Sequence, residues 1–118
     1  MNKKHILKKN IDFQRIIKTT KPYKYKDYII HLERVEEDNY HFGFSVGKKI
    51  GKAVTRNYIK RQLKNIISKK NYQNGFNCII IVGRNILNKT FSEKENDLLE
   101  ALTRLNIIKG ETKWDIQK

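Results

Sequence analysis

The stretch that decides the fold is Gly43-Phe-Ser-Val-Gly-Lys-Lys-Ile-Gly-Lys-Ala-Val-Thr-Arg-Asn-Tyr-Ile-Lys-Arg-Gln-Leu-Lys64. Its beginning alternates in the manner of a β-strand, with Phe42, Phe44 and Val46 on one side. From about Val54 the apolar spacing becomes helical. The residues that recur on one helix face are Ile59, Leu63, Ile66 and Ile67. The stretch therefore predicts a strand, a short basic loop and an amphipathic helix.

The face of this helix opposite the apolar stripe is cationic. It carries Asn57, Lys60, Arg61 and Lys64, while Arg56 lies near the edge of the stripe. No Asp or Glu occurs between positions 38 and 93, although that window holds eleven Lys and Arg residues. A solvated basic face is the ordinary interpretation of such a helix. The absence of neutralising acids favours an anionic partner instead.

The charge of the whole chain supports the same interpretation. The 118 residues include 26 Lys and Arg against 12 Asp and Glu, for a formal net charge of +14. Residues 1–27 carry nine cations and two acids, whereas residues 93–118 carry five cations and six acids. The positive potential is therefore expected on the first helix and the central stretch, and a polyanion would relieve its self-repulsion.

The remaining composition narrows the class of protein. The length allows one domain, with an ordered core over about residues 6–108, a loose basic arm over residues 1–9 and a loose tail from Lys109. The longest apolar run, Cys78–Val82, is far too short to span a membrane. Met1–Asn10 lacks the apolar segment of a signal peptide, and a single Cys cannot form an internal disulfide. We expect a cytoplasmic protein with no membrane partner.

Two further segments precede the central stretch. A helix is predicted from an N-cap at Asn10, with Phe13 and Ile17 on one face, to a stop before Pro22. Residues 28–35 and 40–47 then predict a β-hairpin in which paired residue numbers sum to 75. This register places Tyr28 and Ile30 on one face with Ser45, and it places His31 and His41 on opposite faces.

Two further segments follow the central stretch. Cys78–Val82 predicts a strand buried on both faces, inside the sheet. Ser92-Glu-Lys-Glu95 resembles a capping box and predicts the start of a last helix. With a short first strand near residues 21–25, the fold class is α+β: a small mixed four-stranded sheet with three helices, in the order α-β-β-β-α-β-α.

The sequence offers no protein active site. A nuclease would need clustered carboxylates for a metal ion, or a His pair acting as acid and base. The acids lie mainly in the predicted hairpin turn and the last helix, and no Cys/His spacing typical of a metal site occurs. We predict no catalytic residues and no bound metal. The residues alone leave open several binding proteins: a nuclease subunit, a ribosomal-type RNA-binding protein or a DNA-binding module.

A family resemblance favours the first of these. Lys-Lys-Ile-Gly-Lys-Ala-Val-x-Arg-Asn-x-x-Lys-Arg, over residues 48–61, resembles the signature of the bacterial ribonuclease P protein subunit. Residues 7–14 resemble the family's first helix, and residues 78–84 its last strand. Three positions depart from the family pattern: Tyr58 stands where many relatives have Arg, Ile17 where a second Phe is frequent, and Ile30 where some have Tyr.

The resemblance implies a fold and a function. The fold would be that of ribosomal protein S5 domain 2, with a left-handed βαβ crossover where general principles favour a right-handed one. The chain would assist a catalytic RNA in removing the 5′ leader of precursor tRNA, with Mg²⁺ bound mainly by the RNA and no DNA partner. The RNA-binding residues implied are Lys48, Lys49, Lys52, Arg56, Asn57, Lys60, Arg61 and Lys64. The leader-binding residues implied are Phe13, Ile17, Tyr28, Ile30, Ser45, Asn57, Lys60 and Arg61. The alternative is a small basic ribosomal-type RNA-binding protein.

Overall fold

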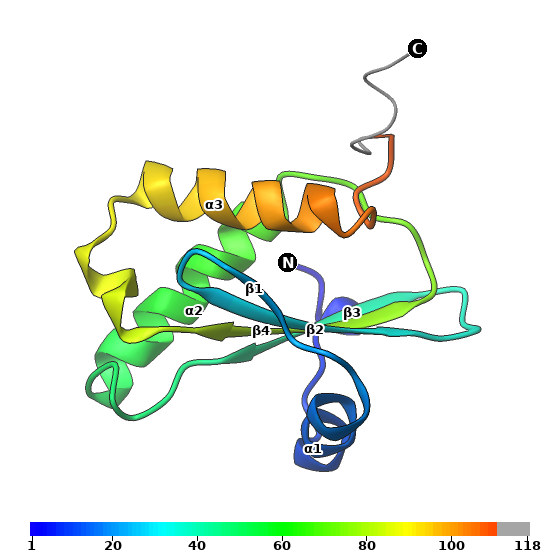
Figure 1. Cartoon of the computed structure of the whole chain (residues 1–118), viewed down its shortest axis with the longest axis horizontal. Coiled ribbons are helices and arrows are strands. Elements are labelled where there is room, and N and C mark those ends of the chain that lie inside the picture. The colour runs from blue at the N-terminus through cyan, green and yellow to red at the C-terminus, as the bar shows by residue number, and fades with distance from the viewer. Residues whose placement is uncertain (111–118) are drawn as a thin grey trace.

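The computed structural model describes residues 1–110 and forms one mixed sheet with helices on both faces (Figure 1). In chain order its elements are the 3₁₀-helix η1 (Lys3–His5), α1 (Asn10–Thr19), β1 (Tyr23–Tyr25), β2 (Tyr28–Arg34), β3 (Tyr40–Ser45), α2 (Ala53–Ile67), β4 (Phe76–Val82), the 3₁₀-helix η2 (Arg84–Asn88) and α3 (Phe91–Arg104). The predicted fold class and the order α-β-β-β-α-β-α are confirmed. The predicted tail falls almost entirely on residues 111–118, outside the described residues.

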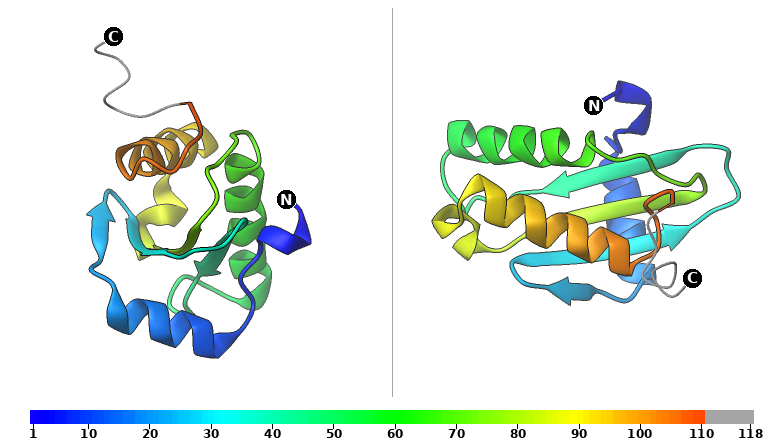
Figure 2. Two further views of the ribbon diagram at one scale, coloured as in Figure 1. Left: turned by 90° about the vertical axis from the view of Figure 1, so that its right-hand side faces the viewer. Right: turned by 90° about the horizontal axis from the view of Figure 1, so that it is seen from above.

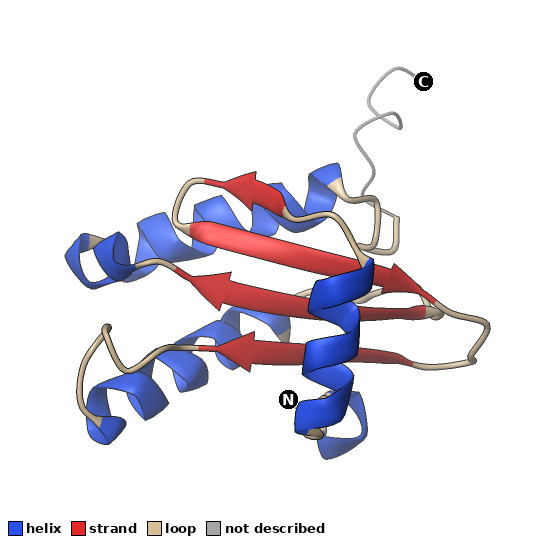
Figure 3. Ribbon diagram, turned by 60° about the horizontal axis from the view of Figure 1, so that its bottom comes forward, coloured by secondary structure: helices blue, strands red, loops and turns tan. Residues whose placement is uncertain are grey.

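β4 lies inside the sheet, as its unbroken apolar run predicts. The strand order is β1-β2-β4-β3, with β4 antiparallel to β2 and parallel to β3. The predicted hairpin between β2 and β3 is therefore wrong, because β4 separates these two strands. The β3–α2–β4 connection that places it there is left-handed, as Figure 3 shows with α2 behind the sheet.

Gly75 lies between the end of β2 and the start of β3 and keeps these two strands apart. The Val35 N–H donates to the Gly75 carbonyl (3.0 Å), and the Gly75 N–H donates to the Asn39 carbonyl (2.8 Å). The two strand ends that a hairpin would pair are instead bridged by the backbone of a third segment. Gly75 has φ +91°, and a Cβ there would lie 3.0 Å from the Val35 oxygen, so the position favours glycine.

The true register reverses the predicted faces. Ile30 and Phe44 both pair with Ile80 from opposite sides, so level residues of β2 and β3 sum to 74 (30 + 44) rather than 75. A shift of one residue exchanges the two faces of a strand. Tyr28 and Ile30 consequently share a face with Phe44, and Ile29 and His31 share the opposite face with Gly43 and Ser45.

The two faces of the sheet have different covers. α2 and α3 pack together on one face, and α1 lies on the other (Figure 2). The strands contribute these buried side chains to the α2 and α3 face: Tyr28, Ile30, Phe42, Phe44, Phe76, Cys78, Ile80 and Val82. The single cysteine is a buried thiol, as the sequence predicts. The hydrophobic core therefore lies almost entirely on one side of the sheet.

Both predicted helix caps are displaced. α1 begins at Asn10 with Lys9 in the cap position, so the Asn10 side chain does not cap it. α3 is capped by Thr90, whose hydroxyl and Glu93 form a capping box two residues before the predicted one. The Glu95 carboxylate instead pairs with Lys69, which follows α2.

The N-terminal segment, predicted to be a loose arm, lies against β3. Ile6 forms a parallel bridge with Phe42, and the Leu7 N–H donates to the Phe42 carbonyl (2.8 Å). The His5 ring stacks on the Tyr40 ring, with centroids 3.9 Å apart. Residues 5–7 thus cover the exposed edge of β3, which protects an edge strand from further pairing.

α1 approaches the sheet through one close contact. The Phe13 ring lies on Gly43 of β3, where a Cβ would be 2.5 Å from the Phe13 Cζ atom. Glycine at this position lets an aromatic ring rest directly on the backbone of the strand. The contact sets how near α1 can come to the sheet.

We predict that Gly43→Ala destabilises the protein by about 1–3 kcal/mol, because the Phe13 ring has to leave its position. Urea unfolding measures the effect. Gly47→Ala is the matched control, since a Cβ there meets no atom within 4 Å. Combining Gly43→Ala with Phe13→Ala should cost less than the sum of the two single changes. Additive effects would show that the ring and the glycine are not coupled.

Candidate nucleic-acid interface

α2 places a stripe of cations along one flank. At about 100° per residue, Lys60 and Lys64 lie on the flank away from α3, and Arg61 lies at the crest of the exposed side. α2 runs along the β3 edge of the sheet, so this flank is turned toward the side that α1 occupies (Figure 2). The helix thus carries its fixed charges toward the less covered face of the sheet.

The structure leaves the predicted RNA-binding cations without acidic partners. Five of the eight residues are exposed, and three are partly buried at the base of the stripe. The exposed residues are Lys48, Lys49, Lys52, Asn57 and Arg61. The partly buried residues are Arg56, Lys60 and Lys64. None of them forms an ion pair with a described residue. Their charge is therefore available to an anion.

Arg56 has a structural contact in addition. Its Nε atom donates to the Gly51 carbonyl (3.1 Å), which ties the start of α2 to the preceding basic loop. The side chain is partly buried, in keeping with its place at the edge of the apolar stripe. A change at Arg56 would disturb this loop as well as remove a charge, whereas Arg61 has no described partner of this kind.

We call the uncovered part of the sheet face beside α1 the α1 groove. Figure 3 shows α1 crossing the strands and leaving bare the half that leads to the carboxyl ends of β3 and β4. Ile29, Ser45 and Ile81 face this side of the sheet and are partly exposed. Ile17 of α1 is 38% exposed. The exposed surface of this part of the sheet and of α1 is therefore partly apolar.

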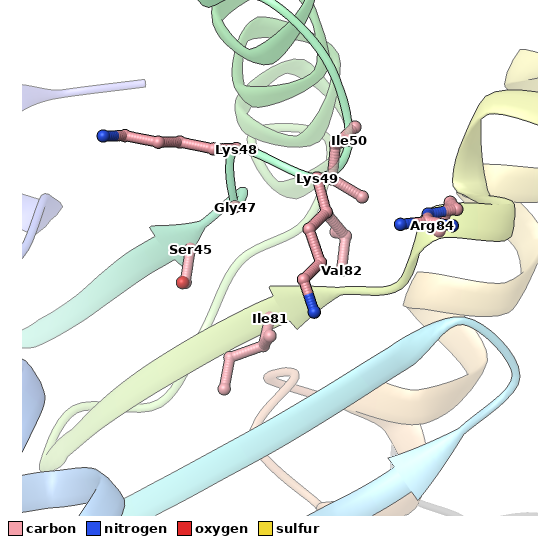
Figure 4. A pocket seen from close by; sticks show the side chains of 8 residues that line it. All are labelled: Ser45, Gly47, Lys48, Lys49, Ile50, Ile81, Val82 and Arg84. Atoms are coloured by element: carbon pink, nitrogen blue, oxygen red, sulfur yellow. The ribbon is translucent and has the colours of Figure 1, made fainter.

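The groove continues into a pocket of about 830 Å³ at the ends of β3 and β4. Its floor is apolar and its rim is cationic. The lining residues are Ser45, Gly47, Lys48, Lys49, Ile50, Ile81, Val82 and Arg84. Figure 4 shows the Lys49 side chain extending over the end of β4, with Arg84 on the other side of Val82 and Lys48 directed away.

Two of the predicted leader-binding residues do not lie in the α1 groove. Tyr28 and Ile30 are 0% exposed on the core face, and the Tyr28 hydroxyl donates to the Lys94 carbonyl (3.0 Å). Burial raises the pKa of Tyr28 well above its usual range. The cause of the error is the one-residue register shift, and the side chains that take their place are Ile29 and Ile81. Phe13, Ile17 and Ser45 do lie on the groove side.

A polar network fixes α1 across the sheet. Arg15 of α1 donates to both carboxylate oxygens of Glu33 (2.9 and 3.3 Å) and to Asp12 (2.7 Å). The Asn77 side-chain amide donates to Glu33 (2.8 Å), and its oxygen faces the His41 Nδ1 atom at 2.8 Å. Because the Asn77 oxygen can only accept, His41 carries its proton on Nδ1. The network therefore links three strands to one helix.

The histidines lie differently from the prediction but still do not form an acid–base pair. His31 and His41 are on the same face of the sheet rather than on opposite faces. The His31 Nδ1 atom is 3.0 Å from the Thr20 hydroxyl, whereas His41 contacts Asn77. Within residues 1–110, no group of three or more His, Cys, Asp or Glu side chains could hold a metal ion. No helix in the same range is long and apolar enough to cross a membrane.

Fold and charge distribution define a small α+β protein with a cationic flank beside a half-covered sheet. The ribonuclease P family model matches residues 1–106. The ribonuclease P protein component of Mycoplasma mobile is 36% identical over 107 residues, covering 90% of this chain and 94% of that protein. A Staphylococcus aureus RNase P protein mutant with defective mRNA degradation activity superposes with a TM-score of 0.79, at 30% identity, over 89% of this chain and 91% of its own. The chain belongs to the ribonuclease P protein family.

We predict that Glu33→Gln lowers the free energy of unfolding by about 1 kcal/mol at neutral pH, because Arg15 loses its charged partner. The hydrogen bonds from Arg15 hold the pKa of Glu33 below its ordinary value of 4.5. A carboxylate with a depressed pKa stabilises the fold above its unfolded pKa and loses that effect as the pH falls through its folded pKa.

Urea unfolding of the wild type and Glu33→Gln at pH 7 and at about pH 3 tests this sign. The difference between the two proteins should shrink on acidification. Glu36→Gln, in the exposed turn between β2 and β3, is the matched control and should have no effect at either pH. A difference that stays constant with pH would mean that the Glu33 charge does not stabilise α1.

Proposed function

We propose that this chain is the protein subunit of a ribonuclease P, which removes the 5′ leader from precursor tRNA with a catalytic RNA. The observation that carries the proposal is the family match over residues 1–106, joined to a cationic flank that no described acid neutralises. The partners are ribonuclease P RNA and precursor tRNA, and the place of action is the cytoplasm.

The basic loop and α2 are proposed to bind the catalytic RNA. Neutralising phosphates with Lys and Arg releases condensed counterions, so binding should weaken steeply with added salt. Arg61 can bind two phosphate oxygens at once, which a Lys cannot copy. The exposed position of Arg61 at the crest of α2 supports this role.

The groove beside α1 is proposed to hold the single-stranded leader. Its apolar floor of Ile29 and Ile81 gives bases a surface, and the rim of Lys49 and Arg84 suits phosphates. Contacts of this kind tolerate most base sequences, as a leader that differs between tRNAs requires. Asn57, Lys60 and Arg61 are proposed as the rim on the α2 side.

The chemistry is assigned to the RNA, which would also hold the Mg²⁺ ions. The protein would contribute binding energy by fixing the leader and the RNA together. Two of its described histidines are held by side chains, His31 by a Thr hydroxyl and His41 by the Asn77 amide oxygen. The third, His5, has its Nδ1 atom 3.0 Å from the Tyr40 carbonyl. Neither the groove nor the pocket is lined by an acid–base pair that could activate water.

We expect the purified protein to leave precursor tRNA uncut and to enable cleavage when combined with a bacterial ribonuclease P RNA at low Mg²⁺. The assay follows release of the 5′ leader at the mature end. RNA alone and protein alone are the controls. Correct cleavage by protein free of RNA, or no gain over RNA alone, would contradict the proposal; the second result would favour a ribosomal-type RNA-binding protein.

The groove gives a second prediction, on leader length. Ile17→Ala should weaken binding of precursor tRNA with a long leader about threefold to tenfold, because partly exposed apolar surface is lost. Ile17→Phe should strengthen it, since an aromatic ring stacks on bases better than an aliphatic side chain. Affinity is compared for leaders of one and of several nucleotides in the assembled complex.

Ile11→Ala is the matched control, because Ile11 is on another face of the same helix and is 71% exposed. It should change neither affinity. Equal losses for short and long leaders in Ile17→Ala would mean that the α1 groove does not hold the leader.

A further inference from the structure

Tyr58 is an exposed aromatic side chain whose hydroxyl is nonetheless held in place. It is 53% exposed on α2. The Gln62 Nε2 atom donates to the Tyr58 hydroxyl (3.3 Å), and the Gln62 oxygen accepts from the Lys94 ammonium (2.7 Å). Lys94 is only 6% exposed, between α2 and α3. A surface ring is therefore connected to the interior by two hydrogen bonds.

The direction of these bonds follows from the chemistry of the groups. An ammonium has donors only, so the Gln62 side chain must turn its oxygen toward Lys94. The amide nitrogen then points toward Tyr58, whose oxygen accepts. The Tyr58 proton is left to donate away from the helix. Burial lowers the pKa of Lys94, and its hydrogen bond to Gln62 (2.7 Å) places this ammonium between the two helices.

The surroundings of Tyr58 on α2 differ from the cationic flank. Tyr58 lies on the flank that faces α3, one turn after Val54, which is 82% exposed. Arg61 stands one turn further on at the crest. No acid occurs in the sequence between positions 38 and 93, so the near sequence neighbours of the ring are apolar, neutral or cationic. The site therefore combines a ring face, an apolar support and a guanidinium.

We propose that Tyr58, with Val54 beside it, stacks on an unpaired base of the catalytic RNA and donates its hydroxyl proton to that nucleotide. The inference rests on the proposed function and adds a contact of a different kind. A ring face takes a base, the neighbouring guanidinium takes its phosphate, and a pre-oriented side chain loses little conformational freedom on binding. Arg61 alone would also suit an acidic protein surface, whereas the exposed ring beside it favours a flat partner such as a base.

Stacking and phosphate binding respond differently to salt, and this separates them. Arg61→Ala should reduce the slope of log affinity against log salt by about one phosphate contact. Tyr58→Ala should weaken binding of the catalytic RNA about tenfold with an unchanged slope. Tyr58→Phe keeps the ring and should retain most of the affinity. Val54→Ala should have a smaller effect than Tyr58→Ala.

A direct readout comes from a Tyr58→Trp variant in a Trp114→Phe background, which makes residue 58 the only tryptophan. Adding the catalytic RNA should quench its fluorescence as the ring stacks on a base. Urea unfolding checks that the variants fold, and changes at such an exposed position should stay within about 0.5 kcal/mol. Wild-type affinity in Tyr58→Ala, a changed salt slope in that variant, or unquenched fluorescence of the Tyr58→Trp variant in the bound complex would each overturn the inference. Failure of the wild type itself to bind the RNA would instead overturn the proposed function.

Discussion

The position of β4 between β2 and β3 is the constraint on which the rest of the structure depends. The strand pairs on both sides, and Gly75 at its start bonds the ends of both neighbours. This arrangement fixes which side chains of β2 and β3 share a face. The pairing therefore also decides which side chains form the core and which face the α1 groove, since alternate residues of each strand point to opposite sides.

The sheet therefore has one apolar face and one face that carries both polar and apolar side chains. α2 and α3 seal the first, while α1 covers only part of the second. α1 is held there by the Phe13 ring on Gly43, by the buried Ile16 side chain and by a charged network. A helix attached in this way leaves neighbouring apolar residues such as Ile29 and Ile81 open to a ligand. The second face therefore keeps exposed apolar side chains although α1 is firmly attached to it.

Much of the fold and of the cationic flank could be predicted from the sequence. The apolar run of β4, the periodicity of α2 and the uneven charge indicated the elements, their order and the cationic flank. The pairing of β2 could not be predicted, because residues 35–39 are typical of a hairpin turn and nothing local shows that a distant glycine enters between the strands. One residue of register then decided that Ile29, and not Ile30, faces the groove. The left-handed crossover came from family resemblance alone, against the general preference.

The acidic side chains are distributed unevenly over the fold. Among the described residues, several ion-paired acids link elements: Glu33 holds Arg15 of α1, Glu95 joins α3 to Lys69 just after α2, and Asp27 and Asp97 share Lys89. Asp12 and Glu100 pair within their own helices. Most of the ion-paired acids thus lie where α1 and α3 are attached to the fold. The loop and the α2 flank keep their cations unpaired, although neutralising them with a few carboxylates would reduce self-repulsion. A surface that remains charged at a cost to the free protein is most stable when a polyanion lies on it.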